Sequence, residues 1–312
     1  MKTNFKTALA AITLAVASIG AQAAPAVLDT GLIQMGVFDS GRLGALGVGL
    51  YGPTGDAITP GCLCEGWGSA ANGVGNYTDG AYGTSGLVSA LLTTTTASGS
   101  GLFAQSVSTW SNGLQVTQTY TYAAGGKLFD VNVSMMNTTG ALMTDVRYAR
   151  TLDWDVTPGY FSSNYTTVYG GTPTGPGGRV LTTSTNPFAA ANPMVFRSQE
   201  QNLNVSNTPG DKGGFFVFGF GDLAAGASIA FDTFIGADRT TAGLLAALGS
   251  VGVEAYSYTT GSSVDGPAYG YGFSGLGLPP SLPGGPSVPE PSSLALLGVA
   301  FLGVFASRRR AK

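Results

Sequence analysis

Apolar and polar residues alternate through the middle of the chain, and this alternation predicts β-strands. It is clearest over residues 114–122 and 128–136, which are joined by a turn at 123–127 that contains two consecutive glycines. Two strands joined in this way form a hairpin. The residues predicted to share one face of each strand are Leu114, Val116, Tyr120 and Tyr122, followed by Phe129, Val131, Val133 and Met135.

Further segments extend the pattern toward the C-terminus. Residues 142–156 alternate over a length that is unusual for one strand, so we expect a bulge or break near 149–151. The other predicted strands are 214–220, 227–235, 256–258 and 269–273. One helix is predicted over 239–248, with Asp238 as its N-cap and Gly249 at its end.

These elements predict an all-β fold, an antiparallel β-sandwich of the jelly-roll or supersandwich kind that occupies residues 24–278 as one domain. No repeat is visible along the chain, which disfavours a solenoid or a propeller. Residues 53–79 and 170–193 are rich in Gly, Pro, Asn and Thr, and we expect them to be long loops. The composition agrees with this class, since 49 glycines and 13 tyrosines accompany only 10% charged residues.

Residues 1–23 have the features of a signal peptide. Lys2 and Lys6 precede an apolar run, and Ala21 and Ala23 supply the small side chains that a signal peptidase requires. We therefore expect export through Sec-type machinery, with cleavage after Ala23. A buried core helix is the alternative interpretation of this segment.

The C-terminal end is built from several consecutive parts. They are a Pro/Gly-rich linker at 279–287, the motif Val288, Pro289, Glu290 and Pro291, an apolar run at 294–306, and the basic cluster Arg308, Arg309 and Arg310. The apolar run is at the short end of what spans a bilayer, and the basic cluster would stay on the cytoplasmic side. This order of parts resembles the PEP-CTERM sorting signal of Gram-negative bacteria.

The resemblance implies that residues 288–312 are a sorting tail with a transmembrane helix. It further implies that an exosortase cuts near the Pro-Glu-Pro sequence and passes the body from the inner membrane to the cell surface or the medium. An uncleaved tail anchor, which would leave the body in the periplasm, is the alternative.

The charge of the body argues against one class of partner. Between the two ends lie eight basic and sixteen acidic residues, so the body is acidic and repels phosphate backbones, and nucleic-acid binding is not expected. The chain has no histidine, which excludes Ser-His-Asp and Cys-His catalysis and zinc sites that contain histidine.

Asp153 and Asp155 form the strongest candidate site in the body. Residues two apart on a strand face the same way, and Asp145 and Arg147 have the same parity, whereas Trp154 is expected in the core. If exposed, this face would offer oxygen ligands to Ca²⁺ or hydrogen bonds to sugar hydroxyls. Apart from Ca²⁺ at this face, no cofactor is expected. The alternatives are a structural or merely solvated face, and catalysis with a distant carboxylate, the candidates being Glu65, Asp79 and Glu200.

The remaining candidates are sulfur and aromatic groups. Cys62 and Cys64 are the only cysteines, and we expect a local disulfide or two loop thiols rather than a redox or metal site. An aromatic group follows the acidic pair and would either form a platform for sugar rings or pack within the fold; its members are Tyr160, Phe161, Tyr165 and Tyr169.

The sequence therefore favours an exported surface or extracellular-matrix protein whose body binds or organises exopolysaccharide without catalysis. A carbohydrate-active hydrolase that works with carboxylates is one alternative. A purely structural coat protein is another, because low charge favours self-association.

Overall fold

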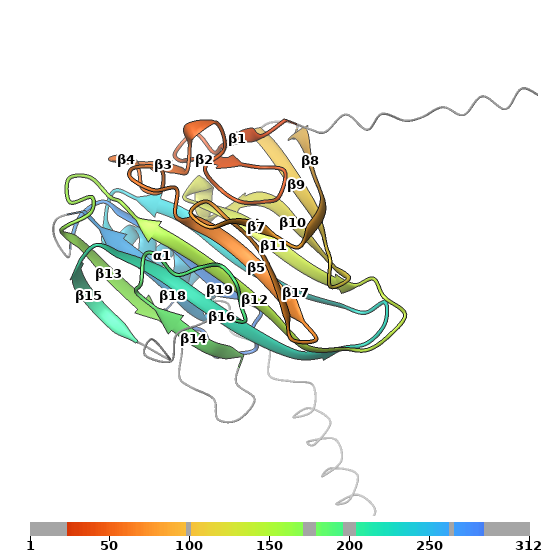
Figure 1. Cartoon of the computed structure of the whole chain (residues 1–312). Coiled ribbons are helices and arrows are strands. Elements are labelled where there is room, and N and C mark those ends of the chain that lie inside the picture. The colour runs from red at the N-terminus through yellow and green to blue at the C-terminus, as the bar shows by residue number, and fades with distance from the viewer. Residues whose placement is uncertain (1–23, 98–100, 171–178, 196–203, 262–264, 284–312) are drawn as a thin grey trace, which may run out of the picture.

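The computed structural model describes residues 24–97, 101–170, 179–195, 204–261 and 265–283. In this part of the chain the strands form three sheets in which every pairing is antiparallel, accompanied by one α-helix. Two larger sheets pack face to face, and a small sheet lies at one end of them (Figure 1). The predicted all-β, antiparallel class is confirmed, and the finer jelly-roll or supersandwich assignment stays a prediction.

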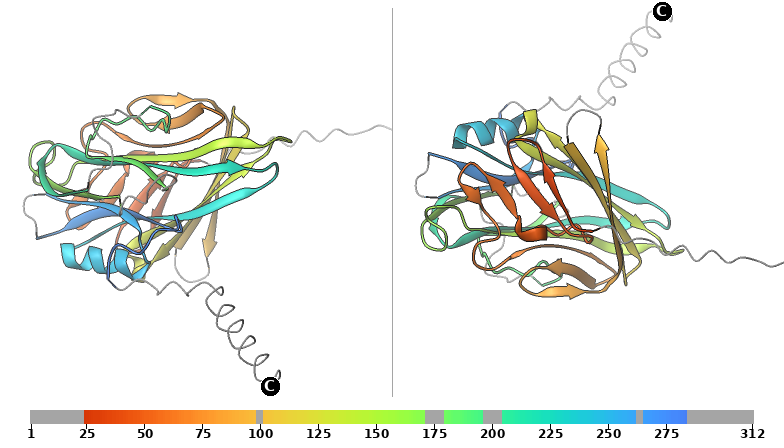
Figure 2. Two further views of the ribbon diagram at one scale, coloured as in Figure 1. Left: turned by 90° about the horizontal axis from the view of Figure 1, so that it is seen from below. Right: turned by 90° about the horizontal axis from the view of Figure 1, so that it is seen from above.

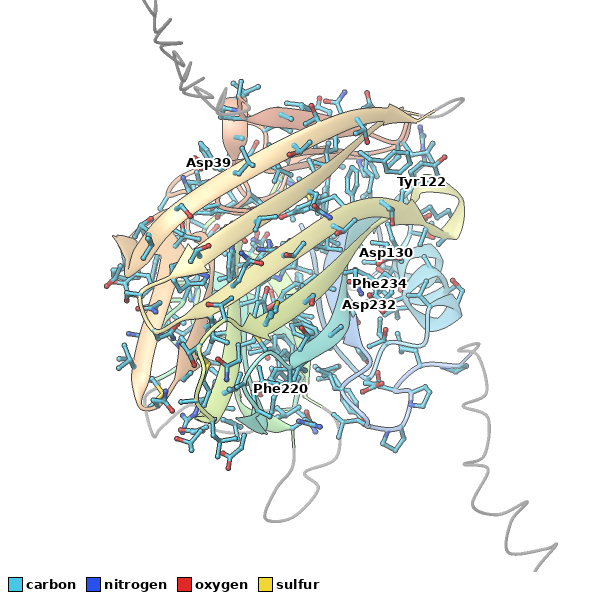
Figure 3. The ribbon with its side chains drawn as sticks, turned by 90° about the vertical axis from the view of Figure 1, so that its right-hand side faces the viewer. Asp39, Tyr122, Asp130, Phe220, Asp232 and Phe234 are labelled. Carbon is cyan, nitrogen blue, oxygen red and sulfur yellow. A yellow bond between two sulfur atoms is a disulfide. The ribbon has the colours of Figure 1, made fainter. Side chains whose placement is uncertain are left out.

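The largest sheet has nine strands. In spatial order they are β15 (Val205–Gly210), β13 (Asn164–Tyr169), β18 (Ala255–Thr260), β19 (Ala268–Ser274), β17 (Ser228–Asp238), β11 (Leu128–Asn137), β10 (Leu114–Ala123), β9 (Gly101–Trp110) and β8 (Leu87–Ala97). The predicted hairpin is present as β10 and β11, which pair from Leu114↔Asn137 to Ala123↔Leu128. Figure 3 views the molecule from the side on which these strands lie, with Tyr122 at the end of β10.

The opposing sheet has six strands and carries the candidate site. Its spatial order is β14 (Val180–Ser184), β16 (Lys212–Leu223), β12 (Met143–Trp154), β5 (Glu65–Ala71), β6 (Val74–Asp79) and β7 (Gly83–Ser85). The small sheet contains β1 (Ala26–Asp29), β2 (Gln34–Val37), β3 (Leu50–Gly52) and β4 (Gly55–Asp56). Two short 3-10 turns, η1 (Ala45–Gly47) and η2 (Ala124–Gly126), complete the described elements.

Two segments predicted as loops contain strands. Residues 53–79 include β4, β5 and β6, and residues 170–193 include β14. All seven residues of β5 are buried, because both faces of this strand are covered. A strand covered on both faces shows no alternation of apolar and polar residues, and β5 is rich in glycine, so the local pattern suggested a loop.

The core between the two larger sheets is aromatic. Phe218 of β16 contacts Phe273 of β19 with 4.7 Å between ring centroids, and Trp154 of β12 lies 5.7 Å from Tyr271 of β19. Trp154 is fully buried, as its parity predicts. Rings of this size, packed at edge-to-face and tilted angles, fix the separation of the sheets.

Strand β12 runs through the middle of its sheet and contains a bulge. The register with β16 shifts between Met143 and Arg147, where Asp145 has a φ of 53°. The bulge expected near 149–151 is therefore at the wrong place, since from Arg147 onward β12 pairs without interruption to both β16 and β5.

The helix α1 (Thr241–Ser250) packs on the outer side of the nine-stranded sheet (Figure 2). Its N-cap is Thr240, whose hydroxyl accepts the Gly243 N–H at 3.0 Å. Asp238, the predicted cap, instead pairs with Lys127 at 2.7 Å and accepts the Thr240 N–H. The predicted start is wrong because Asp238 still belongs to β17, whereas Thr240 has the extended backbone of a cap residue.

The signal peptide expected at 1–23 and the tail expected at 288–312 lie outside the described residues. Within those residues, no helix combines the length and apolar character needed to cross a membrane.

Candidate functional site

Three aspartates meet at the C-terminal end of β12. Asp153 is the penultimate residue of that strand, Asp155 follows it directly, and Asp211 lies between β15 and β16. Strands β12 and β16 are antiparallel with Trp154 opposite Lys212, so the start of β16 brings Asp211 to the end of β12. One carboxylate oxygen from each residue lies within 4.8 Å of those of the other two.

Backbone hydrogen bonds hold the two β12 aspartates in place. The Asp153 N–H donates to the Cys64 carbonyl at 3.0 Å, and the Asp155 N–H donates to the Ala57 carbonyl at 2.9 Å. Between them, Trp154 points to the core, where its indole N–H donates to the Ser257 hydroxyl at 3.2 Å. The alternation of the strand therefore directs both carboxylates away from the core, under the segment that contains Ala57 and Cys64.

Two of the three aspartates are buried, and four of the six carboxylate oxygens have no hydrogen-bond partner among the described residues. Asp153 is 2% exposed and Asp155 is 0% exposed. Within the described residues, Asp153 Oδ1, both oxygens of Asp155 and Asp211 Oδ1 have no hydrogen-bond partner. Buried polar groups are normally satisfied, so this cluster departs from the usual rule.

The environment raises the pKa of all three carboxyl groups. Burial, together with the nearby charges of Asp155 and Asp211, raises the pKa of Asp153 to about 8. Burial and the Asp211 charge raise the pKa of Asp155 to about 7, and burial also raises the pKa of Asp211. Near neutral pH the cluster therefore holds protons or requires a positive charge from elsewhere.

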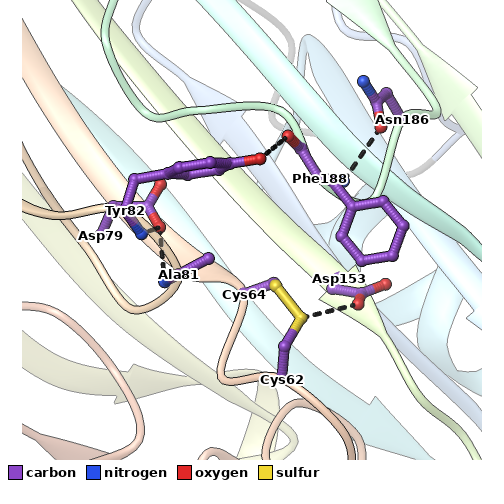
Figure 4. Close-up of a disulfide and its surroundings, with 8 residues drawn as sticks. All are labelled: Cys62, Cys64, Asp79, Ala81, Tyr82, Asp153, Asn186 and Phe188. Atoms are coloured by element: carbon purple, nitrogen blue, oxygen red, sulfur yellow. Dashed lines mark hydrogen bonds between the residues drawn. A yellow bond between two sulfur atoms is a disulfide. The ribbon is translucent and has the colours of Figure 1, made fainter.

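A disulfide between Cys62 and Cys64 covers one side of the cluster (Figure 4). Cys62 Sγ lies 3.5 Å from Asp153 Oδ2. A disulfide sulfur carries no hydrogen, so this contact does not satisfy the carboxylate. The bonded sulfurs are not thiolates either, which leaves oxygen as the ligand type of the site.

Exposed aromatic rings border the cluster. Phe161 is 52% exposed and Phe188 is 50% exposed. A Cβ placed on Gly61 would contact both the Phe161 ring and Asp155 Oδ2, so these two groups flank the same glycine. Phe188 and Asp153 are both drawn around the Cys62–Cys64 disulfide in Figure 4.

The segment that carries Phe188 is held against the six-stranded sheet from both sides. The Tyr82 hydroxyl donates to the Phe188 carbonyl at 2.9 Å. The neighbouring Pro187 lies over Gly213, the residue opposite Asp153 in the β12–β16 pairing. Tyr82 is itself 50% exposed, and its hydroxyl joins the turn after β6 to the segment of Phe188.

The four aromatic residues considered either as one platform or as packing within the fold belong to two separate groups. Tyr160 and Phe161 are neighbours, with 5.9 Å between ring centroids. Tyr169 instead stacks on Tyr256 of β18 at 5.5 Å, and Tyr165 lies opposite Thr260 at the other end of the same strand pair. The first group lies beside the cluster, and the second belongs to the nine-stranded sheet.

Asp145 and Arg147 are distant from Asp153, although they share its strand. Eight residues separate Asp145 from Asp153, which corresponds to about 25 Å along a strand. Asp145 and Arg147 form a two-point ion pair at 2.8 and 2.7 Å and line a cavity of about 400 Å³ together with Arg179 and Phe220. The four charged residues expected on one face therefore form two separate sites.

The carboxylates considered as catalytic partners are placed differently. Glu65 lies opposite Leu152 in the strand pairing, and its carboxylate is buried against Arg150 at 2.6 Å. It also accepts the Leu43 N–H at 2.6 Å. Leu152 belongs to the core, so Glu65 is on the inner face of β5, whereas Asp153 has the opposite parity.

Asp79 accepts the N–H groups of Ala81 and Tyr82 on one oxygen and that of Ala191 on the other. These hydrogen bonds fix the turn at Ala81 and Tyr82 and the segment around Ala191. The Asp79 carboxylate therefore has a structural role in holding these two segments together. Glu200 lies outside the described residues.

Sequence reasoning missed two parts of this site. Asp211 stands outside every predicted strand, and only its position across the β12–β16 pairing brings it to Asp155. Phe188 lies in residues 170–193, which are predicted to form a long loop, and the sequence pattern does not distinguish any residue within that loop. Asp211 directly precedes β16, so strand pairing rather than a local sequence pattern assigns it to the site.

A comparison with protein-family models identifies the C-terminal tail. Residues 287–310 match the model described as the PEP-CTERM protein-sorting motif. The matched range contains the predicted motif Val288–Pro291 and the cluster Arg308–Arg310, so the predicted resemblance is confirmed. A search of the curated proteins found no match to this sequence.

The chain is therefore an exported protein that carries a sorting signal for exosortase processing and is membrane-anchored before that processing. The match covers the tail only, so it identifies how the protein is sorted. It does not assign an activity to the body, for which the site described above is the available evidence.

Proposed function

We propose that the body is a non-catalytic polysaccharide-binding domain, which an exosortase delivers to the surface or matrix of a Gram-negative cell. The observation that carries this proposal is the pair of exposed aromatic rings, Phe161 and Phe188, on segments that pack against the carboxylates at the end of β12. Aromatic faces stack on the apolar faces of sugar rings. Asp153 and Asp155 are buried, so the half-buried Asp211 is the carboxylate of the cluster that a sugar hydroxyl can reach.

The placement of the acids supports binding over hydrolysis. Glycosidases need two carboxyl groups on opposite sides of the scissile bond. Asp153, Asp155 and Asp211 converge at one point, Glu65 is engaged with Arg150 on the opposite side of the sheet, and Asp79 is already hydrogen-bonded. The site therefore favours ligand recognition.

Affinity electrophoresis in gels that contain polysaccharide from the matrix of the producing organism tests the proposal. We expect Phe161→Ala and Phe188→Ala to weaken retention about two- to tenfold each, which corresponds to about 0.5–1.5 kcal/mol for a stacking contact. Tyr51→Ala is the matched control, because Tyr51 is 51% exposed but belongs to β3 in the small sheet. Equal retention of all variants, or no retention of the wild-type protein, would contradict the proposal.

A further inference from the structure

We propose that Asp153, Asp155 and Asp211 bind one divalent cation of the Ca²⁺ type at the C-terminal end of β12. The geometry provides the first argument. Ca²⁺ takes oxygen ligands at about 2.3–2.6 Å, so two ligands on opposite sides of the ion are about 4.8 Å apart. The three carboxylates offer oxygens within 4.8 Å of one another, which is the spacing that a shared ion requires.

The unpartnered oxygens provide a second, independent argument. Asp155 is 0% exposed and neither of its oxygens has a hydrogen-bond partner in the described part of the chain. Asp153 Oδ1 and Asp211 Oδ1 are likewise unpartnered there. A carboxylate buried in this way is stable only when a proton or a cation neutralises it.

The protein supplies little positive charge to this point. None of the ion pairs formed by the described residues includes any of the three aspartates. An external cation would offset the mutual repulsion of the three neighbouring carboxylates.

The ligand type selects the class of ion. Carboxylate oxygens are hard ligands that suit Ca²⁺, and the neighbouring sulfurs are joined in a disulfide and are not available as thiolates. Asp211 is only half-buried, so the site opens to solvent on its side. Water or the hydroxyls of a ligand would complete the coordination there, although cation binding itself does not depend on the proposed polysaccharide.

Isothermal titration calorimetry with CaCl₂ alone, on the purified full-length protein in detergent after EGTA treatment and dialysis, tests this inference. We expect one cation per chain and a rise in the unfolding temperature when Ca²⁺ is added. Asp155→Asn and Asp211→Asn should weaken Ca²⁺ binding at least about tenfold, because ligand charge sets the affinity of such sites. Each substitution removes one negative charge from the three-carboxylate cluster and so reduces the repulsion between the remaining carboxylates. Both variants should therefore be at least as stable as the cation-free wild type.

Asp145→Asn is the matched control, since Asp145 lies on the same strand but pairs with Arg147 at its other end. It should bind Ca²⁺ like the wild type. The inference is overturned if millimolar Ca²⁺ neither binds nor changes the unfolding temperature at pH 7.5, or if Asp155→Asn and Asp211→Asn bind as well as the wild type. Stronger binding of Zn²⁺ than of Ca²⁺ would overturn the assignment of the ion.

The two proposals fail separately. Intact Ca²⁺ binding without retention by polysaccharide would remove the proposed function and leave the cation site. Retention that EGTA does not affect, with no heat of Ca²⁺ binding, would remove the cation site alone.

Discussion

At the scale of single residues, strand alternation and tertiary packing contribute different parts of the site. Alternation around Trp154 predicts that Asp153 and Asp155 share a side, and the structure places their carboxylates together. Alternation does not predict that both are buried, because the covering segments come from distant parts of the sequence. It also does not predict Asp211, which meets the pair only through the register of two strands.

The buried pair of Glu65 and Arg150 leads to a prediction on stability. Both side chains are 0% exposed and lie 2.6 Å apart. We expect Arg150→Met to destabilise the protein by about 3–5 kcal/mol, because it leaves the Glu65 carboxylate buried without its partner. Urea unfolding followed by tryptophan fluorescence measures the loss.

The double variant Glu65→Met/Arg150→Met is the control for this prediction. It removes both charges, so it should be more stable than Arg150→Met alone. A single variant that unfolds at the same urea concentration as the wild type would show that the pair contributes nothing.

Asp130 on β11 leads to a prediction on pH dependence. Burial, together with the charge of Asp232 on the neighbouring β17, raises the pKa of Asp130 to about 6 (Figure 3). The folded state therefore binds this proton more tightly than the unfolded state does. The resulting stabilisation is complete below about pH 4 and is lost as the pH rises through about 6.

Asp130→Asn should remove this component of the pH dependence. The free energy of unfolding of the wild type, minus that of the variant, should fall between pH 4 and pH 7 by at most about 3 kcal/mol, and partial exposure reduces this value. Urea unfolding at several pH values measures the difference. A difference that is constant over this range would show that the pKa of Asp130 is not raised.

At the scale of elements, prediction succeeds where one face of a strand is covered and the other is not. The hairpin of β10 and β11 has this pattern, and its inward residues Phe129, Val131 and Val133 are buried as expected. β5 lacks such a pattern because glycine and other small residues are packed from both sides. β6 lacks it because its buried positions carry the polar residues Asn76, Thr78 and Asp79. The helix was expected in the right place but two residues early, since Asp238 and Thr240 are both suitable caps.

The contact between α1 and its sheet leads to a prediction about close packing. Glycines at 270 and 272 on β19 let the helix and the segment after it approach the sheet. A Cβ on Gly272 would lie 2.7 Å from Val253 Cγ1, so we expect Gly272→Ala to destabilise the protein by about 1–3 kcal/mol. Gly140→Ala is the control, because a Cβ at Gly140 meets no atom within 4 Å. Equal midpoints in urea for the two variants would contradict this packing.

At the scale of the whole molecule, composition and pattern predict the class of the fold but not the arrangement of its strands. Strands that are neighbours in space are often distant in sequence, as β12 is from both β5 and β16. That arrangement creates the candidate site, since β12, β16 and the segment before β5 each contribute to it. The sorting tail was predictable because its signal is local and contiguous.

We propose that this exported protein is cleaved at both ends and released as a folded body. Intact-mass spectrometry of the protein from the native cell envelope and from the medium tests it most directly, because one mass reports both ends. We expect a body that lacks residues 1–23 and everything after about residue 288. A mature protein that keeps the apolar tail would contradict release by an exosortase and would place the body in the periplasm, away from the matrix it is proposed to bind.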